Sequence, residues 1–363
     1  MTCIKLKRFG YSMRHSLISL SMVLLLAAAG CSEQSIGPDR PDTGNGGSGN
    51  GDQEPPRPQV VALHEEFTED FSEEVSGPFD FIYRTTREDF RFFSGVPSYT
   101  ERNTDILMLR IDPADQAGAD RGAVVLSRDY TFYGTYSARI RVPDIRKAQP
   151  NVAAIVDFSV NYEDPSFGYN EISIEWRLAD PTILYLRTVT GVAPVQNKLV
   201  KTVNLADGTV YEAMYSSETV QKNGTSVVNF TGDLAGTQNG PSDFSPLTGF
   251  DASSRFYIYG FDWYPDRITW WIQYSDMDNK IVLWDYEAAD LFPDSPSSTG
   301  IPVIPSRYRL NFWHSKISPA EGNPASVEAP LYPYELEVDR VSYEPFDDLN
   351  NAWLEETAAL DGK

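Results

Sequence analysis

Cysteine and histidine are scarce in this chain, and their scarcity excludes several kinds of site. Of 363 residues, two are cysteines and three are histidines. Cys3 lies in a segment that export would remove, so the mature chain keeps only Cys31 and forms no internal disulfide. No Cys/His cluster has metal-ligand spacing, and no glycine-rich phosphate loop or Ser-His-Asp order stands out. The fold must therefore rest on its apolar core.

Basic residues are also few, with 30 Lys and Arg against 52 Asp and Glu and a net charge of -22. Such a surface repels the phosphate backbone, so nucleic acid is a poor partner. We expect no cofactor to be required. Acidic turns such as Asp276-Met277-Asp278 could hold a structural calcium ion, although turns of this kind are more often simply solvated.

The N-terminal segment has the pattern of an export signal. Residues 1–31 begin with basic side chains and continue with an apolar run over 17–29, which is too short to favour a membrane-spanning helix. Ala28-Ala29-Gly30-Cys31 resembles a bacterial lipobox, in which the cysteine becomes lipidated. Residues 32–58, rich in Gly, Pro, Asp and Ser, predict a flexible linker. We expect an exported cell-envelope protein, anchored by lipid at Cys31 to the outer membrane or cell surface.

Long helical periods are lacking, and residues 59–346 instead predict one domain of short strands. Turn residues separate nearly all the strand-like segments, which favours an antiparallel β-sandwich. Residues 204–250 are polar, with weak strand signals, and predict an extended loop region. Residues 347–363 form a tail that could include a short helix over 350–360. The strand-like segments are 105–111, 123–126, 134–142, 152–160, 171–178, 183–189, 256–263, 267–273, 280–284, 308–313 and 334–343.

The most informative segment is Glu171-Ile172-Ser173-Ile174-Glu175. Its alternation predicts a strand with the two glutamates and Ser173 on one face. The glutamate backbones then lie roughly 13 Å apart, and inward-leaning side chains could approach the roughly 5 Å carboxyl separation of a retaining glycosidase. The alternative is a solvated strand face that happens to carry two acids.

An ordered set of segments resembles glycoside hydrolase family 16, whose fold is a concanavalin A-like antiparallel jelly-roll β-sandwich. The resemblance implies Glu171 as nucleophile and Glu175 as acid/base. One residue separates Ser173 from Glu175, as in the lichenase and transglycosylase members, whose strand has no bulge. This favours a β-glucan-like substrate over laminarin or an algal galactan. The matching segments are 133–140, 171–175, 256–263, 265–270, 305–313 and 331–343.

Two residues depart from the family pattern. Ser173 stands in place of the central Asp, and Tyr257 in place of a His. A serine can donate a hydrogen bond to Glu171 but supplies no second negative charge, so Glu175 loses part of the force that keeps it protonated. We therefore expect low activity, an acidic optimum or no hydrolysis.

Aromatic side chains are the other expected part of a sugar site, because they stack on pyranose rings. For each candidate the alternative is a core position. Trp270 and Trp271 should point to opposite faces of their strand, so at most one lines the site, and Trp263 looks structural. We expect His64 and His314 to be surface or hydrogen-bonded residues. The candidates, of which the first is the strongest, are Tyr169, Trp176, Tyr257, Trp271 and Trp313.

The leading interpretation is a lipid-anchored, monomeric, retaining endo-glycoside hydrolase acting on a β-linked polysaccharide. The alternative is a catalytically weak or inactive carbohydrate-binding protein on the same fold, since one sandwich fold carries both lectins and enzymes. Ser173 and Tyr257 favour the binder, whereas Glu171 and Glu175 favour the enzyme. A third interpretation, a surface structural protein, predicts neither binding nor cleavage.

Overall fold

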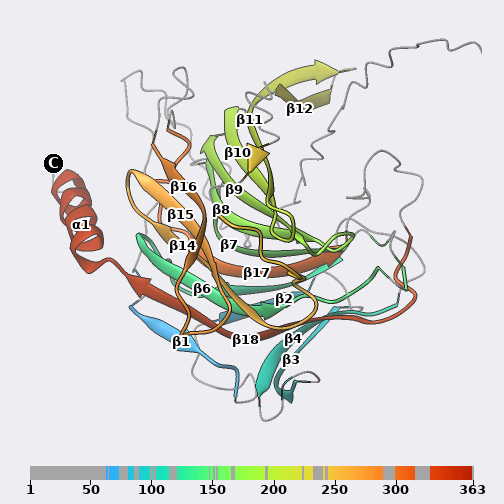
Figure 1. Ribbon diagram of the computed structural model, residues 1–363. Helices are drawn as coiled ribbons and strands as arrows, with labels where there is room; N and C mark the ends of the chain where they lie inside the picture. Colours follow the sequence, from blue (N-terminus) through green and yellow to red (C-terminus); the bar gives the residue numbers. More distant parts are fainter. Residues whose placement is uncertain are drawn as a thin grey trace, which may run out of the picture. The chain divides into compact units, whose positions relative to one another are not determined.

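A computed structural model describes most of the chain after residue 62 (Figure 1). The N-terminal signal and linker predicted for residues 1–58, including Cys31, lie outside the described residues. Within the described part, no helix is both long and apolar enough to span a bilayer. The described residues are 63, 65–72, 81–85, 90–98, 101, 104–113, 121–146, 148–149, 152, 154–164, 168–192, 195–222, 225–231, 240–241, 244–288, 299–314 and 328–361.

Two antiparallel sheets make up the fold. The smaller sheet has the order β16-β15-β14-β6-β18-β4-β3, with β1 paired to β18. Its strands are β1 (Phe67–Glu69), β3 (Phe90–Pro97), β4 (Asp105–Ile111), β6 (Gly134–Arg141), β14 (Tyr257–Trp263), β15 (Arg267–Gln273), β16 (Ile281–Glu287) and β18 (Tyr334–Pro345).

The larger sheet has the order β12-β11-β10-β9-β8-β7-β17-β5-β2, with β13 paired to β11. The predicted all-β antiparallel jelly-roll sandwich is confirmed. The strands are β2 (Phe81–Thr85), β5 (Arg121–Ser127), β7 (Ala154–Asp164), β8 (Gly168–Arg177), β9 (Ile183–Val192), β10 (Val195–Asn204), β11 (Thr209–Lys222), β12 (Thr225–Thr231), β13 (Gly240–Pro241) and β17 (Arg307–His314).

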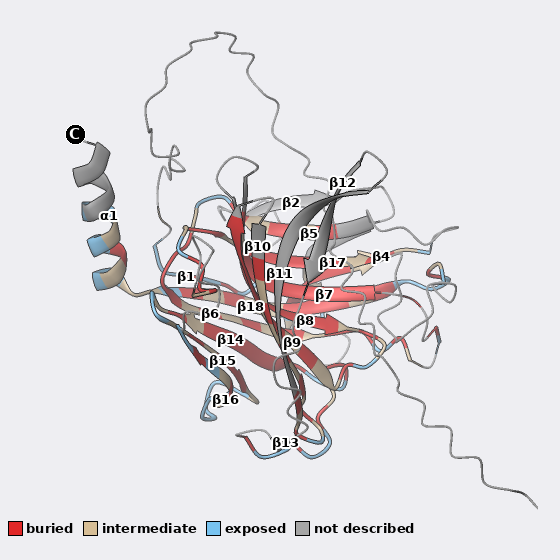
Figure 2. Ribbon diagram, turned by 90° about the horizontal axis from the view of Figure 1, so that it is seen from above, coloured by how far each residue is buried: buried red, intermediate tan, exposed pale blue. Residues whose placement is uncertain are grey.

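The core lies between the two sheets and follows from alternation along the strands. In β6, Tyr136, Ala138 and Ile140 are buried while the residues between them are partly exposed. From the larger sheet, Phe158 of β7 stacks on Phe261 of β14 at 5.4 Å between ring centroids. Each such side chain contributes on the order of 2 kcal/mol when it leaves water. In Figure 2 the central strands β7, β8 and β17 are buried along most of their length.

The segment predicted as an extended loop is instead largely strand. β10, β11 and β12 pair in succession, and the β10–β11 ladder runs from Val203↔Val210 to Asn197↔Ser216. The prediction of an extended loop over 204–250 was therefore wrong over 209–222 and 225–231, whereas the weak strand signals at 210–214 and 226–230 within it correspond to β11 and β12. These strands lie at the end of the sheet, and Leu199 and Val203 of β10 and Val210 of β11 pack in the core. The polar composition of the segment made its strand signals weak.

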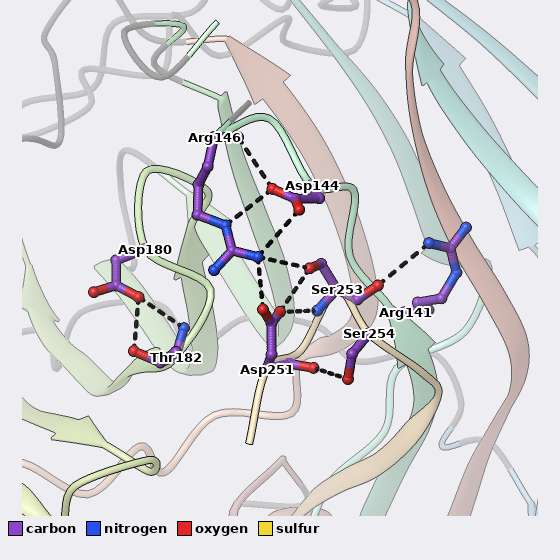
Figure 3. A network of polar contacts seen from close by, with 8 residues as sticks. All are labelled: Arg141, Asp144, Arg146, Asp180, Thr182, Asp251, Ser253 and Ser254. Carbon is purple, nitrogen blue, oxygen red and sulfur yellow. Dashed lines mark hydrogen bonds and ion pairs between the residues drawn. The ribbon is translucent and has the colours of Figure 1, made fainter. Parts of the chain in front are cut away.

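An ion-pair network fixes the loop that enters β14 (Figure 3). The Arg146 guanidinium donates to Asp144 at 2.9 Å and to Asp251 at 2.6 Å, and the second Asp251 oxygen accepts from the Ser253 hydroxyl at 2.6 Å. Burial alone would raise the pKa of Asp251, but the Ser253 and Arg146 contacts outweigh it and lower that pKa. Nearby, the Ala252 N–H donates to the Pro181 carbonyl. The network thereby fixes the turn between β8 and β9, which carry the candidate site.

The chain ends in α1 (Asp347–Asp361), the one helix among the described residues. It takes up most of the tail 347–363, in which a short helix over 350–360 was expected. Asp347 and Asp348 lie in its first turn, where negative charge complements the helix dipole. Leu349 and Trp353, four residues apart, pack against the core, with the Trp353 ring 5.1 Å from that of Phe132.

Candidate functional site

Strand β8 presents Glu171, Ser173 and Glu175 on one face, as the alternation predicts. Ile172 and Ile174 between them are buried in the core. Pairing with β9 runs from Glu171↔Val189 to Glu175↔Tyr185 with no register shift, so the strand has no bulge. The two glutamates therefore point away from the smaller sheet, from a regular strand.

Neighbouring strands add further polar residues to the same face, because directly paired residues of an antiparallel sheet share a face. One row runs from Asn311 through Asp157 and Glu175 to Tyr185. We call this surface the polar face. Its described members include Asp157, Ser159, Tyr169, Glu171, Ser173, Glu175, Arg177, Tyr185, Arg187, Lys198, Arg309, Asn311 and Trp313.

Arg187 of β9 joins the two glutamates. It is the direct cross-strand partner of Ser173, which places its guanidinium midway between the carboxylates. One guanidinium nitrogen pairs with Glu171, and another lies 3.1 Å from Glu175. We call these three residues the arginine-bridged pair. It is buried: Glu171 is 2% exposed and Glu175 is 4% exposed.

Both Glu171 oxygens have further donors. The Tyr169 hydroxyl donates to one oxygen, and the Ser173 hydroxyl donates to the other at 3.0 Å. Ser173 in turn accepts a bond from the Arg187 Nε at 3.1 Å. The expected hydrogen bond from Ser173 to Glu171 is therefore present, and the hydroxyl serves as both donor and acceptor, which a carboxylate at that position cannot do.

The charges around the pair favour ionised carboxylates. Burial alone would raise the pKa of Glu175, but Arg187 and Arg177 outweigh it and hold that pKa below its usual value; the Arg177 Nε lies 3.0 Å from the carboxylate. The pKa of Glu171 is lowered in the same way, against burial, by Arg187 and by the Tyr169 hydrogen bond. Both groups thus act as anions at neutral pH.

Asp157 of β7 behaves in the opposite way. It is 2% exposed, and burial together with the charge of Glu171 raises its pKa to about 7. One oxygen accepts from the Ser159 hydroxyl at 2.7 Å, and the other has no hydrogen-bond partner. Asn311, directly opposite on β17, likewise has an unpaired side-chain oxygen. The polar face thus contains a buried carboxyl that retains its proton far more readily than either glutamate.

Sequence reasoning missed Asp157, Arg187 and Lys198. The available signal was the same period of two that identified β8. In β7, Asp157 and Ser159 alternate with apolar residues, and in β9 Arg187 follows the buried Leu186. Charged residues at every second position of two neighbouring strands indicate one charged face.

The aromatic candidates divide between the polar face and the core. Tyr169 and Trp313 lie on the polar face and are partly exposed, Trp313 in the row of Arg177. Trp176 was predicted to bind substrate, and this is wrong: the residue follows Glu175, so it points to the opposite face, where it is fully buried against Tyr259.

Tyr257 and Trp271 were also predicted as substrate-binding, and the structure places both on the smaller sheet, away from the polar face. Tyr257 is buried in the core, 4.9 Å from Phe250. Trp271 covers Gly260 on the side facing away from the core, and its Nε1 donates to Asp262 at 3.1 Å.

Trp270 points to the opposite side from Trp271, as expected, and its Nε1 donates to the Ser173 carbonyl at 3.2 Å. Trp263 is structural: it is buried and donates to the Pro302 carbonyl.

No metal site is present in the described part of the chain: no three His, Cys, Asp or Glu residues there are grouped to hold an ion. Asp276, one of the calcium candidates, pairs with Arg340, and Asp278 accepts from Ser275 at 2.8 Å. His314 is buried, with a ring nitrogen 3.2 Å from the Glu328 carbonyl oxygen. His64 lies outside the described residues.

No protein-family model and no curated protein matches the chain. Among solved structures it is similar to a native glycosidic hydrolase, with 17% identity and a TM-score of 0.44 over 78% of this chain and 98% of the other. It is also similar to a prokaryotic β-1,3-1,4-glucanase (lichenase) from a mouse hindgut metagenome, with 18% identity and a TM-score of 0.42 over 78% and 100%. The β-glucanase of Bacillus licheniformis has 15% identity and a TM-score of 0.41 over 78% and 99%. These likenesses concern the fold and assign no activity to this chain.

Proposed function

We propose that this protein binds a β-linked polysaccharide on the polar face without cleaving it, and that the ionised pair of Glu171 and Glu175 lies at the centre of the binding surface. The observation that carries the proposal is the arginine-bridged pair. Ionised carboxylates are strong acceptors for sugar hydroxyls. Around them, Tyr169 and Trp313 are partly exposed and offer aromatic surface of the kind that stacks on pyranose rings.

Retaining hydrolysis needs an acid that holds a proton while the leaving group departs. Arg187 and Arg177 work against that role at Glu175, because both stabilise its charged form. The nucleophile is constrained as well, since Glu171 is bonded by Tyr169, Ser173 and Arg187 at once. Hydrolysis through this pair would require the protein to break buried ion pairs in each cycle.

A second candidate, the retaining hydrolase, keeps one specific observation in its favour. Glu171 and Glu175 occupy one face of an unbulged strand, and Asp157 beside Glu171 has a pKa raised to about 7. An ionised carboxylate next to a protonated carboxyl is the combination that acid-assisted glycoside cleavage uses. On this alternative the protein is an endo-acting enzyme with a β-glucan-like substrate.

Binding and cleavage can be separated with one panel of polymers: mixed-linkage glucan, laminarin, xyloglucan, agarose and carrageenan. We expect retardation of the purified protein in a gel containing one of them, with no release of reducing ends. Glu175→Gln should leave the product signal at background, and Asp285→Asn, on the smaller sheet, is the matched control. Product release that disappears in Glu171→Gln and Glu175→Gln would establish the hydrolase instead. If the protein shows no retardation and releases no products, both candidates are rejected.

The cellular setting is part of the proposal. Residues 1–31 would direct export, Cys31 would carry the lipid, and residues 32–58 would give the domain reach from the membrane surface. Cys31→Ser should release the protein from the membrane fraction into the soluble fraction; continued membrane association would contradict the anchor.

A further inference from the structure

The charge of the polar face is opposite to that of the whole chain. Its described members include four cations and three carboxyls, in a protein whose net charge is -22. The pKa of Asp157 is raised to about 7, so this carboxyl is largely protonated below that pH. The cations of the polar face then outnumber its ionised carboxylates. The four cations are Arg177, Arg187, Lys198 and Arg309.

Lys198 forms no ion pair with a described carboxylate, and the charges of Glu175 and Glu171 act on its ammonium only from a longer distance. It lies on β10 directly opposite Val189, which in turn pairs with Glu171. Arg187 is the diagonal neighbour of Lys198, and the arginine-bridged pair already occupies both glutamates. No described carboxylate lies within ion-pair distance of the Lys198 ammonium, which is partly buried.

This arrangement is unfavourable without a partner. Burial and the like charge of Arg187 lower the pKa of Lys198 to about 8, so the protein destabilises the charged ammonium. Glu175 and Glu171 offset this effect only in part, and a partly buried cation that forms no ion pair costs free energy that an arriving anion recovers. The hydroxyls of a neutral sugar do not supply that charge.

We infer that the polysaccharide bound on the polar face is acidic, and that a carboxylate or sulfate group of the sugar pairs with Lys198. The inference rests on the proposed function and adds its substrate class. The surrounding chain is too acidic to attract polyanions generally, so recognition is confined to this face. An anionic group at Lys198 also lies beside Arg187, which can donate a second bond to it.

The test compares each acidic polymer with its neutralised form: polymannuronate against the carboxyl-reduced polymer, and carrageenan against the desulfated polymer. We expect the wild-type protein to bind at least one acidic form roughly tenfold or more tightly than its neutral form, and to lose this preference at high salt. Lys198→Gln should remove the preference while keeping binding to the neutral form. Lys198→Arg should retain it, and Lys280→Gln, which removes a lysine paired with Asp262 on the smaller sheet, should leave it unchanged.

The outcomes distinguish this inference from the proposed function. Equal binding of acidic and neutral forms overturns the acidic ligand and leaves polysaccharide binding intact. If the protein binds no polymer, both the acidic ligand and the proposed polysaccharide binding are overturned. The same conclusion holds if only inorganic sulfate shifts the melting temperature. The comparison of polymers on the wild-type protein needs no variant, so a Lys198→Gln protein that fails to fold does not remove the test.

Discussion

Replacing Arg187 by methionine tests the electrostatic basis of the site most directly. The substitution keeps much of the side-chain volume and removes the one charge that both glutamates share. The side chains of Glu171 and Glu175 are 3% and 5% exposed, so their charges remain buried when the guanidinium is lost. Removing one partner of a buried ion pair typically costs about 3–5 kcal/mol.

The expected loss lies near the lower end of that range. Glu171 keeps hydrogen bonds from Tyr169 and Ser173, and Glu175 keeps Arg177. We therefore expect Arg187→Met to lower the free energy of unfolding by about 3 kcal/mol at pH 7. In a thermal melt this corresponds to a decrease on the order of 10 °C.

The loss should depend on pH in a defined direction. In the wild-type protein the folded-state pKa values of both glutamates are lowered, so their stabilisation is present above the unfolded pKa of about 4.3 and is lost as pH falls through the folded values. Without Arg187, burial raises the folded pKa values, and the variant gains stability as pH falls through them. The difference between the two proteins should therefore be largest at neutral pH and shrink towards pH 4.

Urea unfolding at pH 7 and at pH 4 measures this difference. In a Glu171→Gln/Glu175→Gln background, Arg187→Met should cost less than about 1 kcal/mol at pH 7, because no buried anion is left without a partner. A loss below about 1 kcal/mol in the wild-type background at pH 7, or a loss that is the same at both pH values, would refute the assignment of Arg187 as the charge that ionises the pair.

Three further predictions follow from single positions. Asp157→Asn should raise stability at pH 8 by on the order of 4 kcal/mol but little at pH 4, because the raised pKa of Asp157 makes wild-type stability fall as pH rises from about 4 to about 7; urea unfolding at both pH values checks it. Affinity for an acidic polymer should decrease above pH 8, because Lys198 loses its proton there; the charged groups that act on it are Arg187, Arg177, Glu171 and Glu175. An unchanged affinity at pH 9.5 in a gel-retardation titration would exclude Lys198 as the contact. Gly260→Ala should lower the melting temperature by several degrees, because the new Cβ would lie 2.3 Å from the Trp271 ring, whereas a differential scanning profile identical to that of the wild type would show that the indole moves aside freely.

The central strands could be predicted from the sequence because their two faces differ in polarity. In β6 and β8 the apolar residues alternate with polar ones, and the structure has strands at those positions. In the β10–β12 region the sequence signal is weaker, although Leu199, Val203 and Val210 pack in the core. The strands there also pair through their backbones, which composition does not reveal. Trp176 was predictable as a core residue, since the alternation that places Glu175 on the polar face places its neighbour on the other.

Arg187 shows why the site itself was only half predictable. Its position opposite Ser173 depends on the register between β8 and β9. A slip of one residue would bring Leu186 to that place and turn Arg187 into the core. The burial of Leu184 and Leu186 is what fixes the observed register, so the pairing becomes clear only once both strands are assigned together.

Ser173 and Arg187 change the site in the same direction, although they lie on different strands. A third acid between the two glutamates would raise their pKa values, because neighbouring negative charges disfavour one another's ionised forms. Ser173 supplies no negative charge at that position, and Arg187 brings a positive charge directly opposite it on β9. Ser173 also accepts from Arg187 while donating to Glu171, so the two residues depend on each other. Together they favour the ionised form of Glu171, and Arg187 does the same for Glu175, which is the charge state on which the proposed binding of sugar hydroxyls depends.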